Sequence, residues 1–186
     1  MKRRHYIWTS GLVVAVILGG LSIYDNQEDR VRRTQEPRHT VSSKSIKRRV
    51  HLYFSDEANG YLVAEERALS MPEDAIRGSK KMVQALIDGH ETDLRPTIPV
   101  KTNLLALYVT SKGVAYVDFN AAIRQEHSGG TLAELATIFS VVNTLCLNIA
   151  DIHAVKILIE GREEKTLSGH IDIQKPFKPN LLMLKE

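Results

Sequence analysis

Short runs of β-branched, aromatic and aliphatic residues recur in the part of the chain that follows residue 50. Glycine-containing turns separate them in pairs, as in Asn59-Gly60 and Ser111-Lys112-Gly113, which is typical of β-hairpins. Two weaker runs follow near the C-terminus. The pattern predicts strands at residues 50–54, 61–67, 104–110, 114–120, 154–160, 166–173 and 181–184.

Two longer segments repeat their apolar residues at the spacing of a helix. Each begins with a capping-box pattern, Ser70 with Glu73 in the first and Thr131 with Glu134 in the second. We therefore expect helices over residues 72–88 and 131–148, each with one apolar face. The expected core of the two helices is formed by Val83, Leu86, Leu135, Phe139 and Val142.

These elements follow one another in the order ββαββαββ. Consecutive hairpins favour antiparallel pairing, and an amphipathic helix must bury its apolar face against a sheet. The sequence therefore predicts an α+β fold with two layers, in which a mostly antiparallel sheet carries two amphipathic helices on one face. A transmembrane helix is expected to precede this domain.

The first part of the chain has a different character. Residues 7–24 carry no charge and follow Lys2, Arg3 and Arg4; a helix of this length, at about 1.5 Å per residue, roughly crosses a hydrocarbon core. A signal peptide cleaved after Ser22 is the alternative. We expect a cytoplasmic N-terminus at residues 1–6, a transmembrane anchor at 7–24, a disordered linker at 25–49 and a folded domain at 50–186.

Charge is distributed unevenly along the chain. Residues 1–50 hold 11 Lys and Arg against 4 Asp and Glu, whereas residues 51–186 hold 14 against 18. Basic charge beside an anchor favours an anionic membrane surface, while a nucleic-acid-binding protein carries it on the folded domain. The distribution favours a membrane as partner and argues against nucleic acid. The single cysteine, Cys146, excludes an intramolecular disulfide and fits a buried apolar position.

Residues with catalytic potential are scattered. Gly129-Gly130 precedes a helix, but no dinucleotide, P-loop or nucleophile-elbow motif is present. His170 and Asp172 would share a strand face and could bind a metal with a distant carboxylate. A hydrolase site would require Asp118, His127, Glu134 and His170 to converge on one cleft. We expect none of these sites, and therefore no catalytic residue, cofactor or metal.

Asn143 is the polar residue that most needs a partner, because Val142, Leu145 and Cys146 around it are apolar. A loop offers the backbone groups that a buried amide can bind. We expect Asn143 to hold the loop at Thr97-Ile98-Pro99.

A series of short motifs occurs in order over residues 50–178. They are Leu52-Tyr53-Phe54 with Asp56, Leu62-Val63-x-Glu65, Ala85-Leu86-Ile87-x-Gly89, Thr97-Ile98-Pro99, Val117-Asp118-Phe119, Gly129-Gly130-Thr131-x-x-Glu134, Val142-Asn143-Thr144-Leu145, Leu158-Ile159-Glu160-Gly161 and Leu167-x-Gly169-His170. The ordered set resembles the GerMN domain, which is named for the sporulation and spore germination protein GerM. This chain carries one copy, whereas the founding protein carries two.

The resemblance implies a compact α/β domain that is tethered outside the cytoplasm and used in assembly or scaffolding, with no established enzyme activity. It also implies a set of family-motif positions with structural or interaction roles. These are Asp118, Phe119, Gly129, Gly130, Glu134, Asn143, Thr144, Glu160, Gly161, Gly169 and His170.

We therefore expect a non-enzymatic, membrane-anchored extracytoplasmic interaction or scaffolding domain of the bacterial cell envelope. Its expected partners are the membrane and either envelope proteins or a second copy of itself. The first alternative is a ligand- or peptide-sensing domain that uses the 89–103 loop and the Gly129-Gly130 turn as a rim. The second alternative is an envelope hydrolase.

Overall fold

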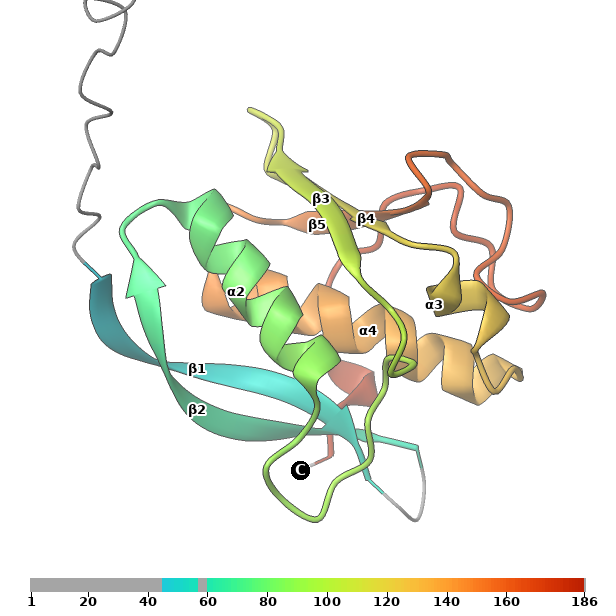
Figure 1. Ribbon diagram of the computed structural model, residues 1–186, viewed down its shortest axis with the longest axis horizontal. Coiled ribbons are helices and arrows are strands. Elements are labelled where there is room, and N and C mark those ends of the chain that lie inside the picture. Colours follow the sequence, from blue (N-terminus) through green and yellow to red (C-terminus); the bar gives the residue numbers. More distant parts are fainter. Residues whose placement is uncertain (1–44, 57–59, 186) are drawn as a thin grey trace, which may run out of the picture. The chain divides into compact units, whose positions relative to one another are not determined.

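The computed structural model describes residues 45–56 and 60–185, which lie in one folded unit (Figure 1). The expected anchor at residues 7–24 lies outside the described residues, as does the expected linker up to residue 44. The elements are β1 (Ser45–Ser55), β2 (Leu62–Pro72), α2 (Ala75–Asp88), β3 (Leu104–Val109), β4 (Val114–Phe119), α3 (Ala122–Gln125), α4 (Thr131–Asn148), β5 (Ala154–Ile159) and the 3-10 helix η1 (Leu181–Met183).

The strands form two separate sheets, so the prediction of a single sheet is wrong. β1 and β2 form an antiparallel pair, and β3, β4 and β5 form the second sheet in that order. β3 and β4 are antiparallel, whereas β4 and β5 are parallel. The parallel pair follows from the connection, because α4 crosses over between β4 and β5 and returns the chain in the same direction.

The ends of the chain's elements also differ from the expected ones. β1 begins at Ser45, inside the expected linker, and pairs with β2 as far as Pro72. α2 consequently begins later than expected, and Asp74 caps it by accepting a hydrogen bond of 2.6 Å from the backbone N–H of Arg77. Residues 166–173 form isolated bridges in place of a strand, and residues 181–183 form η1.

α4 lies between the two sheets and contacts β1, β5 and α2 (Figure 1). Every residue from 136 to 145 is buried, so the helix is covered around most of its circumference and not on a single face. Among the described residues it is the one helix long and apolar enough to cross a membrane, but 61% of it is buried inside the domain. A core helix has the same composition, and α4 has that role here.

The expected core residues of the two helices are confirmed with one exception. Val83, Leu86 and Val142 are fully buried and Phe139 is 8% exposed, whereas Leu135 is only partly buried. The core also extends through β1, β4 and β5, whose inward-facing residues include Phe54, Val117 and Ile157.

Side chains of α4 also bind the backbone of β1. Thr144 accepts a hydrogen bond from the N–H of Tyr53 at 3.3 Å. Asn148 accepts from the N–H of His51 at 2.9 Å and donates to its carbonyl at 2.7 Å. These bonds satisfy backbone groups of β1 that β2 does not pair, so a two-stranded sheet is fixed to the central helix.

Candidate functional site

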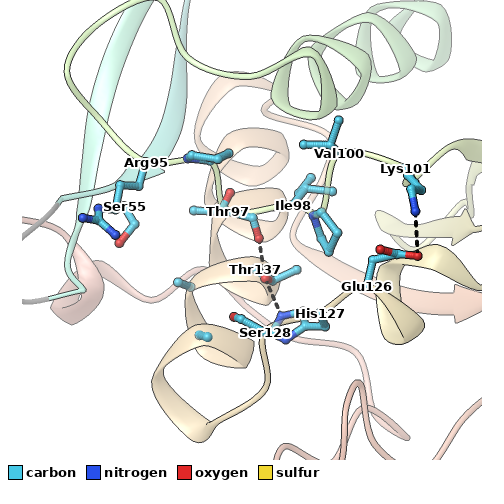
Figure 2. A pocket seen from close by; sticks show the side chains of 14 residues that line it. Ser55, Arg95, Thr97, Ile98, Val100, Lys101, Glu126, His127, Ser128 and Thr137 are labelled. Carbon is cyan, nitrogen blue, oxygen red and sulfur yellow. Dashed lines mark hydrogen bonds and ion pairs between the residues drawn. The ribbon is translucent and has the colours of Figure 1, made fainter.

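An open cleft of about 620 Å³ lies between the loop that follows α2 and the segment that joins α3 to α4 (Figure 2). Its apolar lining comes from Pro96, Ile98, Pro99, Val100, Ala133 and Ala136. Its polar lining comes from Ser55, Arg95, Thr97, Lys101, Glu126, His127, Ser128 and Thr137. A concave surface that combines apolar side chains with placed polar groups is typical of a binding site.

The loop that forms one wall of the cleft is fixed at its start by a buried ion pair between Glu65 and Arg67. Glu65 accepts hydrogen bonds from the N–H of Glu91 and from the N–H and hydroxyl of Thr92. Arg67 donates to the carbonyl of Gly89 at 2.7 Å. Burial alone would raise the pKa of Glu65, but the hydrogen bonds from Thr92 and Arg67 outweigh it, and the pKa lies below its ordinary value.

Two further contacts hold the middle of this loop. Ser55 and Arg95 exchange backbone hydrogen bonds of 3.2 and 2.8 Å, which attach the loop to the end of β1. The N–H of Thr102 donates to the carbonyl of Pro99 at 2.9 Å and closes a turn. The turn leaves Val100 85% exposed beside the cleft. The wall is therefore a constrained loop that presents an apolar side chain to solvent.

A chain of hydrogen bonds connects the floor of the cleft to this loop (Figure 2). The N–H of Gly129 donates to Nδ1 of His127 at 2.9 Å, so Nδ1 is an acceptor and Nε2 carries the proton. Nε2 then donates to the hydroxyl of Thr137 at 2.9 Å, and that hydroxyl donates to the carbonyl of Thr97. Nε2 of His127 thus holds the loop through Thr137, while Nδ1 fixes the turn at Gly129.

Acidification is expected to weaken this hydrogen-bond chain. Burial lowers the pKa of His127 from its ordinary value of 6.5, against a smaller opposing effect of the Glu134 charge. A lowered folded-state pKa gives a stabilisation that is complete above pH 6.5 and is lost as the pH falls through the folded-state value. Urea unfolding of wild type should therefore show a decline between about pH 6.5 and pH 4.5 that His127→Gln lacks.

The exposed His153 provides the matched control for this measurement. His153→Gln should retain the decline of the wild type. An identical pH dependence in His127→Gln and wild type would contradict the proposed role of the ring.

The outer rim of the cleft carries an ion pair between Lys101 and Glu126, with Nζ and Oε1 3.1 Å apart (Figure 2). Their side chains are 73% and 45% exposed, so the pair contributes little to stability. Thr97, in contrast to the exposed ion pair, is buried, with 7% of its surface exposed. Its hydroxyl has no hydrogen-bond partner among the described residues. A buried unpaired hydroxyl in a cleft calls for an explanation, and binding is one.

Glu134 and His170, two of the family-motif positions, lie together beside the start of α4. The carboxylate of Glu134 is fully buried and accepts bonds from the N–H groups of His170 and Ile171, at 3.0 and 2.9 Å, and from the His170 ring at 2.7 Å. Burial would raise the pKa of Glu134, but these hydrogen bonds outweigh it and hold the pKa below its ordinary value. Glu134 therefore fixes the loop that contains Gly169, instead of closing the capping box expected with Thr131.

Asp118 and Glu160 hold a second connection, at the ends of β4 and β5. Oδ1 of Asp118 accepts from the N–H of Gly161 at 2.9 Å, and Oε1 of Glu160 accepts from the N–H of Ala121 at 2.7 Å. Glu160 and Gly161 both have a positive φ, of 54° and 72°. The two carboxylates tie the turn after β5 to the end of β4, where Phe119 is buried in the core.

Asn143 is fully buried, but its partner is not the one expected. Its side chain accepts from the N–H of Asn180 at 3.0 Å and donates to the carbonyl of Asn180 at 3.1 Å. The expected partner, the loop at residues 97–99, is held by Thr137. Asn143 lies six residues further along α4 than Thr137, and it contacts the C-terminal segment at Asn180.

Replacing Asn143 with leucine is expected to release the C-terminal segment. The change leaves both backbone groups of Asn180 without their partner, at a cost of about 1–3 kcal/mol. Hydrogen exchange should become faster at residues 180–184 and stay unchanged at residues 92–103. Thr144→Val, which removes a bond to β1 from the next position, should leave the exchange of the C-terminal segment unchanged. Faster exchange at residues 92–103 would contradict the observed pairing.

The remaining glycine positions of the motif set shape the turns around the cleft. Gly129 and Gly130 have φ angles of 77° and 89°, which disfavour any residue with a Cβ, and they lead the chain into α4. Gly169 has a φ of 113° in the loop that Glu134 holds. Of the two turns expected to form a rim, the 95–101 segment and Ser128, next to Gly129, line the cleft.

Among the four residues of the hydrolase alternative, Glu134 and His170 contact each other and the charge of Glu134 also acts on His127, but each side chain is engaged in a hydrogen bond within the fold. Glu134 binds His170, whereas Asp118 binds Gly161 and His127 binds Thr137. Within residues 45–56 and 60–185 there is no group of three or more His, Cys, Asp or Glu that could hold a metal ion. Asp172, which was considered with His170 for a metal site, accepts a hydrogen bond from the N–H of Gln174. Burial raises the pKa of the Cys146 thiol to about 11, which disfavours the reactive thiolate.

Fold and site together define an α+β domain in which two small sheets pack around a central helix and a cleft opens beside the start of that helix. The chain belongs to the Germane family, described as sporulation and spore germination, whose family model matches residues 51–165. This is a sporulation-domain family and not a known enzyme family, and the GerMN-like membership expected from the motifs is confirmed. No curated protein matches the chain.

Several solved structures share the fold, including the following three. One is described as a "putative lipoprotein" from Clostridium perfringens (23% identity, TM-score 0.52, 72% of this chain and 87% of that chain covered). The tandem GerMN domains of the sporulation protein GerM from Bacillus subtilis match at 24% identity and a TM-score of 0.60, over 72% of this chain and 46% of that one. The first GerMN domain of GerM alone matches at 24% identity and a TM-score of 0.55, over 68% and 96%.

Proposed function

We propose that this protein is a non-enzymatic interaction domain of the bacterial cell envelope, held at a membrane by residues 7–24, and that the cleft is where it docks a partner. The GerM likeness and the lipoprotein likeness support an extracytoplasmic, membrane-associated setting. The uncharged run and the basic residues before it support an anchor.

The observation that carries the proposal is the composition of the cleft. Six of its fourteen lining residues are apolar and the other eight are polar, and Val100 at its edge is 85% exposed. The titratable group at its floor, His127, uses both ring nitrogens in hydrogen bonds within the fold, one with Gly129 and one with Thr137, so it is not poised to move a proton to or from a substrate. Binding without chemistry is the function that such a surface supports best.

The partner best suited to this cleft is a polypeptide segment. Ile98, Ala133 and Ala136 contribute to the lining of the cleft, while the charged side chains of Lys101 and Glu126 lie at its rim. Apolar anchors of a partner segment can fill the floor, and its polar backbone can face the rim. The buried hydroxyl of Thr97 is a polar group that a docked segment could reach after a small shift of the loop.

Filling the cleft is expected to abolish partner binding without unfolding the domain. Ala133 is partly exposed on α4 and lines the cleft, so Ala133→Trp places an indole in the space. Full-length protein would be purified from solubilised membranes, and co-purifying envelope proteins would be quantified against wild type. A partner retained by wild type should be lost from Ala133→Trp.

Leu147→Trp is the matched control, because Leu147 is 42% exposed on the same helix and does not line the cleft. It should retain the partner, and both variants should keep the melting midpoint of the wild type. Equal recovery of every co-purifying protein with Ala133→Trp would contradict the proposed role of the cleft.

A further inference from the structure

The last turn of the chain presents two leucines to solvent. In η1, Leu181 is 62% exposed and Leu182 is 87% exposed. A single exposed leucine on a protein surface is ordinary, but two adjacent ones on the same turn form a small apolar projection. The other apolar residues of the turn, Met183 and Leu184, are partly buried against the core.

The turn is clamped on both sides, so the exposure of the leucines is imposed by the fold. Before the turn, the buried Asn143 binds both backbone groups of Asn180, and Oδ1 of Asn180 accepts from the N–H of Leu182 at 3.1 Å. After the turn, Leu184 bridges to Leu62, and the N–H of Lys185 donates to the carbonyl of Leu62 at 2.9 Å. A fully buried amide on the central helix is thus used to hold a surface turn in place.

A lysine lies on each side of the two leucines, and the one that follows them forms an ion pair. Lys178 precedes Leu181 by three residues, is exposed and has no partner among the described residues. Lys185 follows Leu182 by three residues, and its Nζ is 3.1 Å from Oδ2 of Asp56. Leucines framed by lysines match the interface of an anionic bilayer, where apolar side chains enter the acyl boundary and cations meet the headgroups.

We propose that the turn at Leu181 and Leu182 is a membrane-contact surface, which inserts its leucines into an anionic bilayer and orients the tethered domain on it. The proposal rests on the proposed membrane tether. The surface area of two leucine side chains is much smaller than the area of about 800 Å² that each partner of a stable protein complex buries. A weak second contact is nevertheless sufficient for a chain that a tether already holds near the membrane.

The test uses the full-length chain in vesicles and an environment-sensitive label on the turn. In a Cys146→Ala background, Leu182→Cys would be labelled with a nitrobenzoxadiazole fluorophore, whose emission moves to shorter wavelength in a bilayer. Val100→Cys, at another highly exposed apolar position, is the matched control. The vesicles contain either phosphatidylcholine alone or phosphatidylcholine with phosphatidylglycerol.

We expect a shift to shorter wavelength at position 182 in vesicles with phosphatidylglycerol, and none at position 100. Lys178→Gln should lower the equilibrium constant for insertion roughly fivefold, because a basic residue near an anionic surface contributes about that factor. Lys112→Gln, in the turn between β3 and β4, should have no effect. High salt should reduce the shift.

Three results would overturn the proposal. They are no shift at position 182, an equal shift at position 100, or a shift that depends on protein density and not on phosphatidylglycerol, which would indicate contact with a second copy. Carbonate washing of the same vesicles tests the tether separately. If carbonate removes the chain from the vesicles, the proposed anchor is contradicted. The fluorescence of the label, measured before washing, still shows whether the turn enters the bilayer.

Discussion

Glu134→Gln is expected to lower the free energy of unfolding by at least about 1.5–3 kcal/mol, because one hydrogen bond to a charged group contributes that much and Glu134 accepts several. The side chain of Glu134 is fully buried, and its two oxygens accept bonds from two backbone N–H groups and the His170 ring. Glutamine has the same size, but its NH₂ group would face donors and leave at least one of them unpaired. Urea unfolding at neutral pH measures the loss.

The pH dependence of this loss is a second readout of the same variant. Because the pKa of Glu134 lies below its ordinary value of 4.5, its stabilisation is complete above that pH and disappears as the pH falls through the folded-state value. The difference between wild type and Glu134→Gln should therefore shrink below about pH 4.5. Glu126→Gln, at the exposed ion pair, should cost less than about 1 kcal/mol. A similar small cost for Glu134→Gln would contradict the role given to this carboxylate.

Phe139→Ala is expected to cost about 3–5 kcal/mol, the range for truncating a buried phenylalanine. Phe139 is 8% exposed in the middle of α4, and its ring meets the edge of Phe177 with centroids 5.8 Å apart. Since α4 contacts both sheets, a cavity at this position weakens the packing of the whole domain. Leu132→Ala, on an exposed position of the same helix, should cost less than about 1 kcal/mol. A loss below about 1 kcal/mol for Phe139→Ala would contradict the central place of α4.

The periodic segments of the sequence predicted their elements well. The bounds of α4 agree with those expected, and β3, β4 and β5 each differ by one residue at their ends. These elements have strong local signals, such as glycine turns and long apolar runs. α2 began later than expected because Ser70 lies in β2, whose pairing with β1 continues to Pro72. Tertiary pairing there overrides a local capping signal.

What the sequence could not predict depends on contacts between distant segments. The parallel pairing of β5 with β4 leaves no local pattern, and α3 has only four residues. Asn143 was recognised as a residue that needs a partner, but a single sequence does not indicate which loop supplies it. Glu134 was expected to cap its own helix, whereas its partners are 36 and 37 residues away.

The candidate cleft was partly predictable. The sequence indicated two glycine- and proline-rich segments as a rim, and the 95–101 segment and Ser128 do line it. The hydrogen bonds that hold the loop could not be predicted. Thr137 lies in an apolar helical run, and the sequence does not indicate which group its hydroxyl binds. His127 carried a signal, as an isolated histidine before Gly129-Gly130, but nothing in the sequence connected it to Thr137.

Site-specific photocrosslinking from the cleft tests the central claim most directly. A benzophenone amino acid at Val100, on the exposed edge of the cleft, would be activated in intact cells that produce the full-length protein. The same probe at Tyr108, which is 48% exposed on β3 and does not line the cleft, is the control. We expect one discrete adduct with another envelope protein from position 100, none from position 108, and loss of the adduct when Ala133→Trp is added. The absence of an adduct from position 100, or an adduct that Ala133→Trp leaves unchanged, would contradict a docking role for the cleft.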